Sequence, residues 1–265
     1  MGYAPVVIVG AGLAGYTLAK ELRKLTPDLP ITLLTADSGD FYSKPMLSTA
    51  LTQNHSPCDL VQATAAEQAA KLDLRLIPNC RVHAINRAAK RLETDDGPLS
   101  YRRLVLATGA RPRASDFPGA NTALSINHLD DYTRFRSRLR PRARVCILGA
   151  GLVGCEFAND LVASGHQVTV VEAGRRPLAR LLPDPLAVRL RDALKALGVQ
   201  WHFDSGVTCI TETTDGYIVH LSRNEWVLAD LVLSAVGLIP ETLSLIHISE
   251  PTRLLSISYA VFCLK

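Results

Sequence analysis

The chain has 265 residues, of which 48% are hydrophobic, and a formal net charge of +4. This length supplies a core for one large domain or two small ones, and so small a charge does not by itself indicate a nucleic-acid partner. No apolar run approaches the ~20 residues of a membrane-spanning helix, and the N-terminus lacks the ordered parts of a signal peptide.

The first 35 residues predict a strand–helix–strand unit. The apolar, β-branched run at 6–9 is typical of a buried parallel strand. Leucines at helical spacing predict a helix over 13–25, which the proline-containing stretch at 26–30 ends. A second strand follows at 31–35.

The next stretch predicts a helix, a meander and another buried strand. A serine and a proline at 56 and 57 have the character of an N-cap and a first-turn proline, which predicts a helix over 56–71. A short strand at 74–77 precedes a meander over 81–101 with a turn at 95–97. The apolar run at 104–107 predicts a further buried strand.

The same pattern then starts again. A strand is predicted at 145–148, a helix over 152–163, a strand at 167–171 and a helix over 185–197. The four strands predicted after that helix lie near 199–204, 207–213, 217–222 and 226–235. This internal duplication predicts an α/β fold with two Rossmann-like βαβ dinucleotide-binding domains, built from parallel sheets and antiparallel meanders.

Each copy carries a G-x-G-x-x-G motif between its first strand and its first helix. The six glycines are Gly10, Gly12, Gly15, Gly149, Gly151 and Gly154. In such a motif the first glycine makes a tight turn, the second lets a pyrophosphate approach the backbone, and the third lets the helix pack on the strand. The phosphates then lie at the positive end of the helix.

An acidic residue ends the second strand of each copy, Asp37 in the first and Glu172 in the second. An acid at this place binds a ribose 2′-hydroxyl and repels a 2′-phosphate, so Glu172 favours NADH over NADPH, a preference that Arg175 and Arg176 would weaken. The alternative is that the glycines are only turn residues and the acids only surface charges. Strand, turn, helix and acid agree in both copies, which favours two sites, for FAD and for a nicotinamide nucleotide.

Two segments resemble the FAD-dependent pyridine nucleotide reductases. These are LVLATGARP at 104–112 and DLVLSAVGLIP at 230–240. Within that family, FYSKPMLS at 41–48 and GLVGCEFAND at 151–160 are most similar to the bacterial rubredoxin–NAD(+) reductases and nearly as similar to the flavorubredoxin reductases. The resemblance covers residues 5–242.

The resemblance implies that NADH delivers hydride to FAD, which then passes single electrons to rubredoxin or a similar small acidic iron protein. It also implies a catalytic pair beside the flavin, in which Lys44 stabilises negative charge and Glu156 holds Lys44. A structural ion pair and two unrelated surface charges are the alternatives. The other residues that the resemblance assigns to the cofactors are Leu13, Ala14, Pro45, Val82, Thr108, Gly109, Arg111, Leu152, Val153 and Gly237.

The cysteines depart from one branch of that superfamily. Its disulfide reductases carry a redox-active cysteine pair after the second strand, whereas residues 42–45 read Tyr-Ser-Lys-Pro. We therefore expect electrons to leave to an external one-electron carrier. The six cysteines form no C-x-x-C pair and no metal-ligand spacing, which indicates reduced thiols of a cytoplasmic protein without a metal site.

Arginine occupies every second position from 134 to 144. The favoured interpretation is a solvated helix face and a linker. A docking patch for an acidic carrier such as rubredoxin is the second interpretation. Nucleic-acid binding is the third, and no nucleic-acid partner is expected because interleaved aromatic residues and a binding motif are both missing. For the whole chain, the alternatives are a ferredoxin or flavorubredoxin reductase and, in another class, a flavin-binding signalling or nucleic-acid-binding protein.

The expected domains follow from the duplication and the resemblance. Residues 1–112 are expected to form the first half of a discontinuous FAD-binding domain, 113–236 an NAD(H)-binding domain, and 237–242 the start of the return to the FAD domain. Residues 243–265 resemble the conceptual translation of a sequencing adapter, so we expect a non-native tail there. The second half of the FAD domain is then missing, and we expect the truncated chain to bind FAD poorly.

Overall fold

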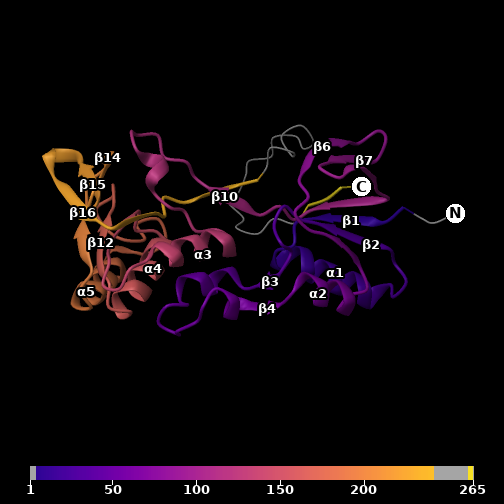
Figure 1. Cartoon of the computed structure of the whole chain (residues 1–265), viewed down its shortest axis with the longest axis horizontal. Helices are drawn as coiled ribbons and strands as arrows, with labels where there is room; N and C mark the ends of the chain where they lie inside the picture. The colour runs from indigo at the N-terminus through magenta and orange to yellow at the C-terminus, as the bar shows by residue number, and fades with distance from the viewer. Residues whose placement is uncertain (1–3, 242–261, 265) are drawn as a thin grey trace. The chain divides into compact units, whose positions relative to one another are not determined.

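The computed structural model describes residues 4–241 and 262–264 of the chain (Figure 1). The chain divides into two compact units. Unit 1 contains the described residues of Met1–Ser43, Val61–Arg111 and Pro240–Lys265, and unit 2 consists of Lys44–Leu60 and Pro112–Ile239. The expected non-native tail over 243–265 lies outside the described residues, except for 262–264.

Unit 1 is built on a mainly parallel sheet. In order across the sheet its strands are β19 (Phe262–Leu264), β9 (Arg103–Leu106), β1 (Val6–Val9), β2 (Ile31–Leu34) and β5 (Arg75–Ile77). Strands β9, β1, β2 and β5 run parallel, and β19 is antiparallel to β9. Figure 1 shows α1 (Leu13–Leu25) and α2 (Ala65–Lys71) on one side of this sheet.

Alternating residues of β1 lie in two different core clusters of unit 1. Ile8 is fully buried in a cluster with Tyr16 and Ala19 of α1. Its neighbour Val7 is equally buried in a second cluster with Leu92 of the antiparallel meander. The strands of the meander are β6 (Val82–Asn86), β7 (Arg91–Thr94) and β8 (Gly97–Ser100). Burial on both faces explains why β1 is an uninterrupted apolar run.

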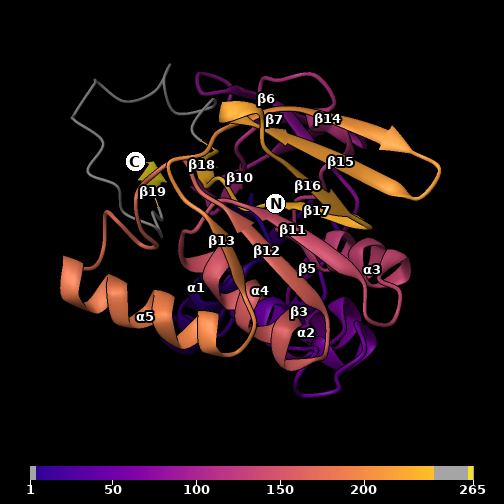
Figure 2. The same ribbon diagram turned by 90° about the vertical axis from the view of Figure 1, so that its left-hand side faces the viewer.

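Unit 2 repeats the parallel arrangement. Its sheet has the order β13 (Gln200–His202), β12 (Gln167–Val171), β11 (Arg144–Leu148) and β17 (Leu231–Ser234), all parallel. The helices of this unit are α3 (Leu129–Arg138), α4 (Leu152–Ala163) and α5 (Asp184–Ala196). A second, antiparallel sheet consists of β14 (Val207–Thr213), β15 (Gly216–Leu221) and β16 (Trp226–Ala229) (Figure 2).

Two further pairs of short strands complete the described elements. The first pair is β3 (Phe41–Tyr42) with β4 (Val61–Ala63), and the second is β10 (Ala110–Pro112) with β18 (Leu238–Pro240). The short 3-10 helices are η1 (Lys44–Ser48), η2 (Cys58–Leu60), η3 (Ala120–Thr122) and η4 (Ser222–Asn224). The predicted α/β fold with two βαβ units, parallel sheets and antiparallel meanders is confirmed.

The helix predicted over 56–71 is wrong in its first half. Ser56 forms a turn in which its amide and hydroxyl donate to the Asp59 carboxylate. The helix α2 begins only at Ala65, after Thr64, whose hydroxyl accepts from the Glu67 amide while the Glu67 carboxylate accepts from the Thr64 amide. This reciprocal capping box sets the start of the helix more strongly than a serine and a proline upstream.

The strand predicted over 226–235 is two strands. Asp230 separates β16 from β17, and the two strands belong to different sheets. The Asp230 carboxylate accepts from the backbone amide of Arg144 at 2.7 Å and from its guanidinium at 2.6 Å. The chain passes from one sheet to the other where this side chain is held, and an apolar pattern alone does not show such a break.

Candidate functional site

The glycine turn of unit 1 joins β1 to α1. Gly10 has φ +113°, and a Cβ there would lie 2.2 Å from the carbonyl oxygen of Ala107. A Cβ on Gly15 would lie 1.9 Å from the carbonyl oxygen of Gly10. Both positions therefore require glycine, because the clashing atoms belong to the backbone. A Cβ on Gly12, the N-cap of α1, would meet no atom within 4 Å.

The glycine turn of unit 2 has the same construction. Gly149 has φ +101°, and its Cβ would lie 2.7 Å from the carbonyl oxygen of Ala235. A Cβ on Gly154 would lie 2.0 Å from the carbonyl oxygen of Gly149. A Cβ on Gly151, the N-cap of α4, would again meet open space. In both units the first and third glycines are needed for packing, whereas the second keeps a space free at a helix N-terminus. A pyrophosphate fits such a space.

Apolar side chains follow the open glycines. Leu13 is 62% exposed, Leu152 56% and Val153 39%, and Ala14 is half-buried. Each belongs to the first turn of its helix. Their exposure at the helix N-terminus fits the expectation that they cover a bound cofactor.

The acid of unit 2 is bonded to its own glycine turn. One oxygen of the Glu172 carboxylate accepts from the Ala150 amide at 2.7 Å, and the other accepts from the Gly174 amide at 2.8 Å. The side chain remains half-buried. Two amide donors hold the carboxylate beside the turn in a fixed orientation, where it is suited to accept a hydrogen bond from a ribose hydroxyl.

The acid of unit 1 is held by the loop that carries it. The Thr35 hydroxyl donates to the Asp37 carboxylate at 2.5 Å, and the Gly39 amide donates to the same oxygen at 3.1 Å. The Tyr16 hydroxyl of α1 donates to the Gly39 carbonyl. Burial, followed by the charges of Asp37 and Asp40, raises the pKa of Tyr16 to about 12, so Tyr16 remains a neutral donor that fixes this loop.

The two arginines after Glu172 have different partners. The Arg176 guanidinium lies 2.6 Å from the Asp184 carboxylate and donates to the Leu182 carbonyl. The Arg175 side chain is 91% exposed and lies 3.8 Å from Asp204. Arg176 is therefore engaged in fixing the start of α5, and Arg175 is the one that could still approach a 2′-phosphate.

A third group of predicted residues follows β9. The Thr108 hydroxyl donates to the Glu241 carbonyl, the Glu241 amide donates to the Gly109 carbonyl, and the Arg111 guanidinium lies 3.2 Å from the Glu241 carboxylate. Glu241 thus organises this turn although no motif singled it out. Val82 packs against the core of unit 1, and Gly237, at φ +111°, accepts from the Arg113 amide.

Glu156 on α4 is exposed, and its carboxylate accepts from the Ser48 hydroxyl at 2.6 Å. Lys44 and Pro45 are exposed at the start of η1, the helix that ends with Ser48. The segment with Lys44, expected in the first domain, lies in unit 2 together with Glu156. The direct contact of Lys44 with Glu156 stays a prediction.

Sequence reasoning missed Asp160. This residue lies one helical turn after Glu156 and is only 1% exposed. Its carboxylate accepts from the Leu51 amide at 3.1 Å, the Thr52 amide at 2.8 Å and the Thr52 hydroxyl at 2.5 Å. The partners are more than 100 positions away in the sequence, so no local pattern could have shown them.

The arginines at 134–144 differ in their partners. Arg134 lies 3.2 Å from Asp131, and the Arg136 guanidinium lies over the Tyr132 ring at 5.9 Å. Arg144 binds Asp230. The remaining three, Arg138, Arg140 and Arg142, are exposed around the end of α3 and the following turn. This arrangement agrees with a helix face and a linker, and a docking role stays a prediction.

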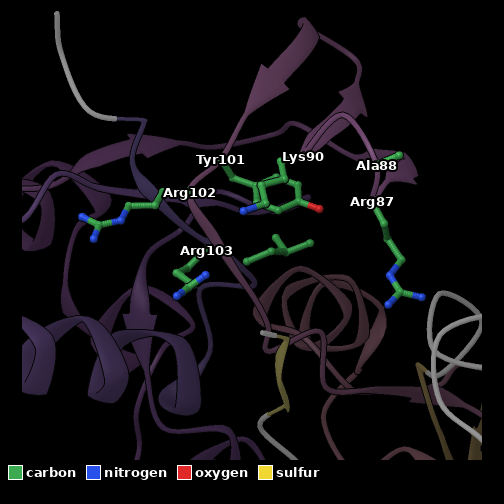
Figure 3. Close-up of a pocket in the computed structure, with 7 residues that line it drawn as sticks. Arg87, Ala88, Lys90, Tyr101, Arg102 and Arg103 are labelled. Atoms are coloured by element: carbon green, nitrogen blue, oxygen red, sulfur yellow. The ribbon is translucent and has the colours of Figure 1, made fainter.

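A hollow of about 290 Å³ in unit 1 lies away from the glycine turn. Its lining residues are Arg87, Ala88, Lys90, Tyr101, Arg102, Arg103 and Leu104 (Figure 3). Arg103 is opposite Val6 at the start of the parallel strands, whereas the glycine turn follows their other end. Figure 3 shows Arg87 and Arg102 pointing away from each other, so these two guanidinium groups do not converge on one point.

The described residues contain neither a metal-ligand cluster nor a membrane-spanning helix. Within residues 4–241 and 262–264, no group of three or more histidine, cysteine or acidic residues could hold a metal ion. None of the helices in the described part is long and apolar enough to cross a membrane.

Burial raises the pKa of the Cys146 thiol to about 12. Burial, followed by the charges of Glu172 and Glu156, raises the pKa of the Cys155 thiol to about 11. These two thiols are therefore unreactive at neutral pH.

Solved structures of reductases share this fold. A ferredoxin reductase of the CYP199A2 system from Rhodopseudomonas palustris matches 92% of the chain with a TM-score of 0.84 and 31% identity, over 61% of its own length. A chain in the covalent putidaredoxin reductase–putidaredoxin complex matches 91% of the present chain, with a TM-score of 0.84 and 29% identity. The match covers 60% of that other chain.

Curated relatives agree with these structures. Rubredoxin-NAD(+) reductase from Acinetobacter baylyi is 41% identical over 246 residues, and the nitric oxide reductase FlRd-NAD(+) reductase from Aeromonas salmonicida is 36% identical over 236 residues. Each match covers 89% of this chain and, respectively, 63% and 61% of the relative, so the chain spans less than two thirds of their length. A family model described as pyridine nucleotide-disulphide oxidoreductase matches residues 4–252. The chain therefore belongs to the pyridine nucleotide-disulphide oxidoreductase family.

Proposed function

We propose that this chain is the dinucleotide-binding part of a flavoprotein that takes hydride from NADH and delivers electrons singly to an iron-containing carrier protein, most suitably rubredoxin. The observation that carries the proposal is the presence of two open glycine turns, one in each unit, each followed by a positioned acid. The names of the relatives, rubredoxin-NAD(+) reductase and FlRd-NAD(+) reductase, support the reaction and the kind of partner.

Unit 1 is the proposed FAD site. The space at Gly12 would admit the pyrophosphate to the N-terminus of α1, and Asp37 would accept from a ribose hydroxyl. Leu13, Ala14, Val82, Thr108, Gly109 and Arg111 are the further proposed contacts. When bound, FAD supplies the redox chemistry that these side chains lack, because it takes up a hydride and releases electrons singly.

Unit 2 is the proposed NADH site. The space at Gly151 admits the pyrophosphate at the N-terminus of α4, and the fixed carboxylate of Glu172 binds the ribose that a 2′-phosphate would modify. Leu152, Val153 and Gly237 are further proposed contacts. The two amide donors hold the Glu172 carboxylate in one orientation, and an acid at this place repels a 2′-phosphate, which favours NADH over NADPH.

Lys44 and Glu156 are the proposed catalytic pair, and they and Pro45 are also proposed cofactor contacts. The role of Lys44 is to stabilise negative charge that develops on the reduced flavin, and that of Glu156 is to orient Lys44. The hydrogen bond from the Ser48 hydroxyl supports a Glu156 side chain that is held in one orientation. We expect Lys44→Met to slow flavin reduction by NADH while leaving NADH affinity unchanged, and an unchanged rate of reduction would remove this role.

The experiment for the proposed function compares electron donors and acceptors with the chain saturated by added FAD, because the truncated chain is expected to bind FAD poorly. Steady-state reduction is measured with NADH and NADPH, and with rubredoxin, flavorubredoxin and ferredoxin at equal concentrations. We expect NADH to be the better donor and rubredoxin the best acceptor. If ferredoxin or flavorubredoxin were reduced faster than rubredoxin, the proposed carrier would be replaced, and the proposed reaction would stand. Failure of NADH to bleach the flavin would overturn the function, and salt-dependent nucleic-acid binding without turnover would point to the other class.

A further inference from the structure

Two carboxylates one helical turn apart on α4 hold the segment Lys44–Leu60. Glu156 accepts from the Ser48 hydroxyl, and Asp160 accepts from the amide of Leu51 and from the amide and hydroxyl of Thr52. Residues at i and i+4 lie on the same face of a helix. Ser48 and Thr52 are also four residues apart, so the segment follows this face of α4 in register.

Asp160 makes the stronger attachment. Its side chain is 1% exposed, and one of its oxygens accepts at 2.8 and 2.5 Å from the two donors of Thr52. Hydrogen bonds to a charged acceptor are roughly twice as strong as neutral ones, and a buried carboxylate is costly unless its acceptors are satisfied. The three donors from one short loop satisfy this carboxylate and fix the loop.

The loop that Asp160 holds continues directly from the helix that begins with Lys44. Thr49 donates its amide to Met46 within η1, and His55 donates its amide to Ala50 at the far side of the loop. Leu47 and Ala50 between them are buried. Through this compact turn, the place at which Thr52 is fixed on α4 determines where η1 lies on the same helix.

We propose that Asp160 is a positioning residue that keeps Lys44 in register with Glu156 by fixing Leu51 and Thr52 on α4. The inference rests on the proposed function, since it assigns Asp160 to the chemistry through Lys44. Because α4 begins at the open Gly151, the same helix carries the proposed nicotinamide site, the two carboxylates and the segment with Lys44. Asp160 thereby joins the lysine to the NADH-binding unit, although Lys44 precedes that unit's glycine turn by about a hundred residues.

The first test measures amide hydrogen exchange in the full chain, without any cofactor. Asp160→Asn replaces one acceptor oxygen with an NH₂ group, which cannot accept from a backbone amide. We expect exchange to accelerate at least about tenfold at whichever of the Leu51 and Thr52 amides faces the new NH₂ group, as for an amide that loses a buried partner. Asp192→Asn, an exposed aspartate on α5, is the matched control and should leave these amides unchanged. Unchanged exchange in Asp160→Asn would overturn the proposal.

The second test is a double-mutant cycle on flavin reduction by NADH. We expect Asp160→Asn to lower the limiting rate about tenfold, because misplacement of a catalytic group by a fraction of an ångström has effects of this order, with NADH affinity unchanged. In a Lys44→Met background the same substitution should have no further effect, since the two changes act through one group. Additive effects would show that Asp160 acts only on stability and would overturn the positioning role.

Thr52→Val provides a milder variant if Asp160→Asn does not fold. It removes the hydroxyl donor and leaves both amide bonds and the side-chain shape in place, so we expect a smaller fall in rate that also disappears with Lys44→Met. An effect of equal size in both backgrounds would again contradict the proposal. A wild-type chain that is not reduced by NADH would overturn the proposed function instead, and the exchange measurement would still decide whether Asp160 fixes the segment.

Discussion

The two units build the same glycine turn but support it in different ways. In both, the third glycine lies against the carbonyl of the first, because an added Cβ would lie 1.9 Å from that oxygen at Gly15 and 2.0 Å from it at Gly154. In unit 2 the acid reaches back to this turn, because Glu172 accepts from the Ala150 amide. In unit 1 the shorter Asp37 accepts from its own loop, at Thr35 and Gly39. The close packing of the two glycines is therefore common to both turns, whereas the partners of the acid differ between the units.

The starts of the central strands differ in the same way. The Asp230 amide donates to the Arg144 carbonyl at 2.8 Å, and at the same place in unit 1 the Arg102 amide donates to the Pro5 carbonyl at 2.8 Å. Unit 2 adds the Asp230 carboxylate, which binds both the amide and the guanidinium of Arg144. Pro5 has no amide proton, so that additional clamp is impossible in unit 1.

The largest expected effect is a loss of stability when the glycine turn that the two units share is altered. We expect Gly15→Ala and Gly154→Ala each to lower the free energy of unfolding by about 3 kcal/mol, because the new methyl group meets a backbone carbonyl that cannot move freely. The matched controls, Gly12→Ala and Gly151→Ala, place a methyl group in open space and should change stability by less than about 1 kcal/mol. Urea unfolding followed by circular dichroism measures all four, and equal losses at the second and third glycines would contradict the account.

The next effect tests the difference between the acids. We expect Glu172→Gln to reduce the ratio of kcat/KM for NADH over NADPH about tenfold, or about 1.4 kcal/mol, because the charge that repels a 2′-phosphate is removed. Asp37→Asn is the counterpart and should leave that ratio unchanged, since its acid belongs to the other unit. Steady-state kinetics with both nucleotides give the ratios, and a change in the Asp37 variant would show that the acids are not assigned to separate cofactors.

The smallest effect tests the strand clamp. Chiefly through its hydrogen bond, the Arg144 guanidinium holds the pKa of the Asp230 carboxyl below the ordinary value of 3.8. Because the pKa of Asp230 is lower in the folded state than in the unfolded state, its stabilisation of the fold is fully present above about pH 4. This stabilisation is lost as the pH falls through the folded-state pKa. We expect Asp230→Asn to lower stability at pH 7 by about 1 kcal/mol, a value limited by the partial exposure of the pair.

Unfolding experiments between pH 7 and pH 2 check this prediction. The difference between the Asp230→Asn variant and the wild type should narrow as the pH falls through the acidic range. Asp192→Asn, in an exposed pair on α5, should show little difference at any pH. If the difference in free energy of unfolding between Asp230→Asn and the wild type stayed constant down to pH 2, the carboxylate charge would not be what holds Arg144.

Local patterns predicted the parts of the molecule that local chemistry determines. The helices at Leu13–Leu25 and Leu152–Ala163 have the predicted bounds, because strand, glycine turn and apolar periodicity all lie within a few residues. The predicted meander is present with its turn before Gly97. The start of α2 was misplaced because the stronger cap, Thr64 with Glu67, lies eight residues after the serine that seemed to begin it.

The supporting contacts could not be predicted because they join distant positions. Asp160 is a single aspartate inside a helix, and its partners at Leu51 and Thr52 become visible only when the chain folds. Glu241 likewise has no motif, yet it binds Arg111 and the turn at Gly109. The spacing of the glycines and acids is a property of the sequence, whereas the contacts that hold Lys44–Leu60 on α4 depend on packing between distant parts of the chain.

The central claim, that each unit binds its own dinucleotide, is tested most directly by crossed substitution of the two open glycines. Gly12→Val and Gly151→Val each place a branched side chain in one phosphate space, at an extended N-cap residue where an added Cβ meets no atom within 4 Å. FAD affinity is measured by titration with added FAD, because the truncated chain is expected to bind it poorly, and NADH affinity is measured by fluorescence titration. We predict that Gly12→Val loses FAD and keeps its NADH affinity, and that Gly151→Val keeps FAD and weakens NADH at least about tenfold. Parallel loss of both cofactors in both variants, or of neither, would contradict the account.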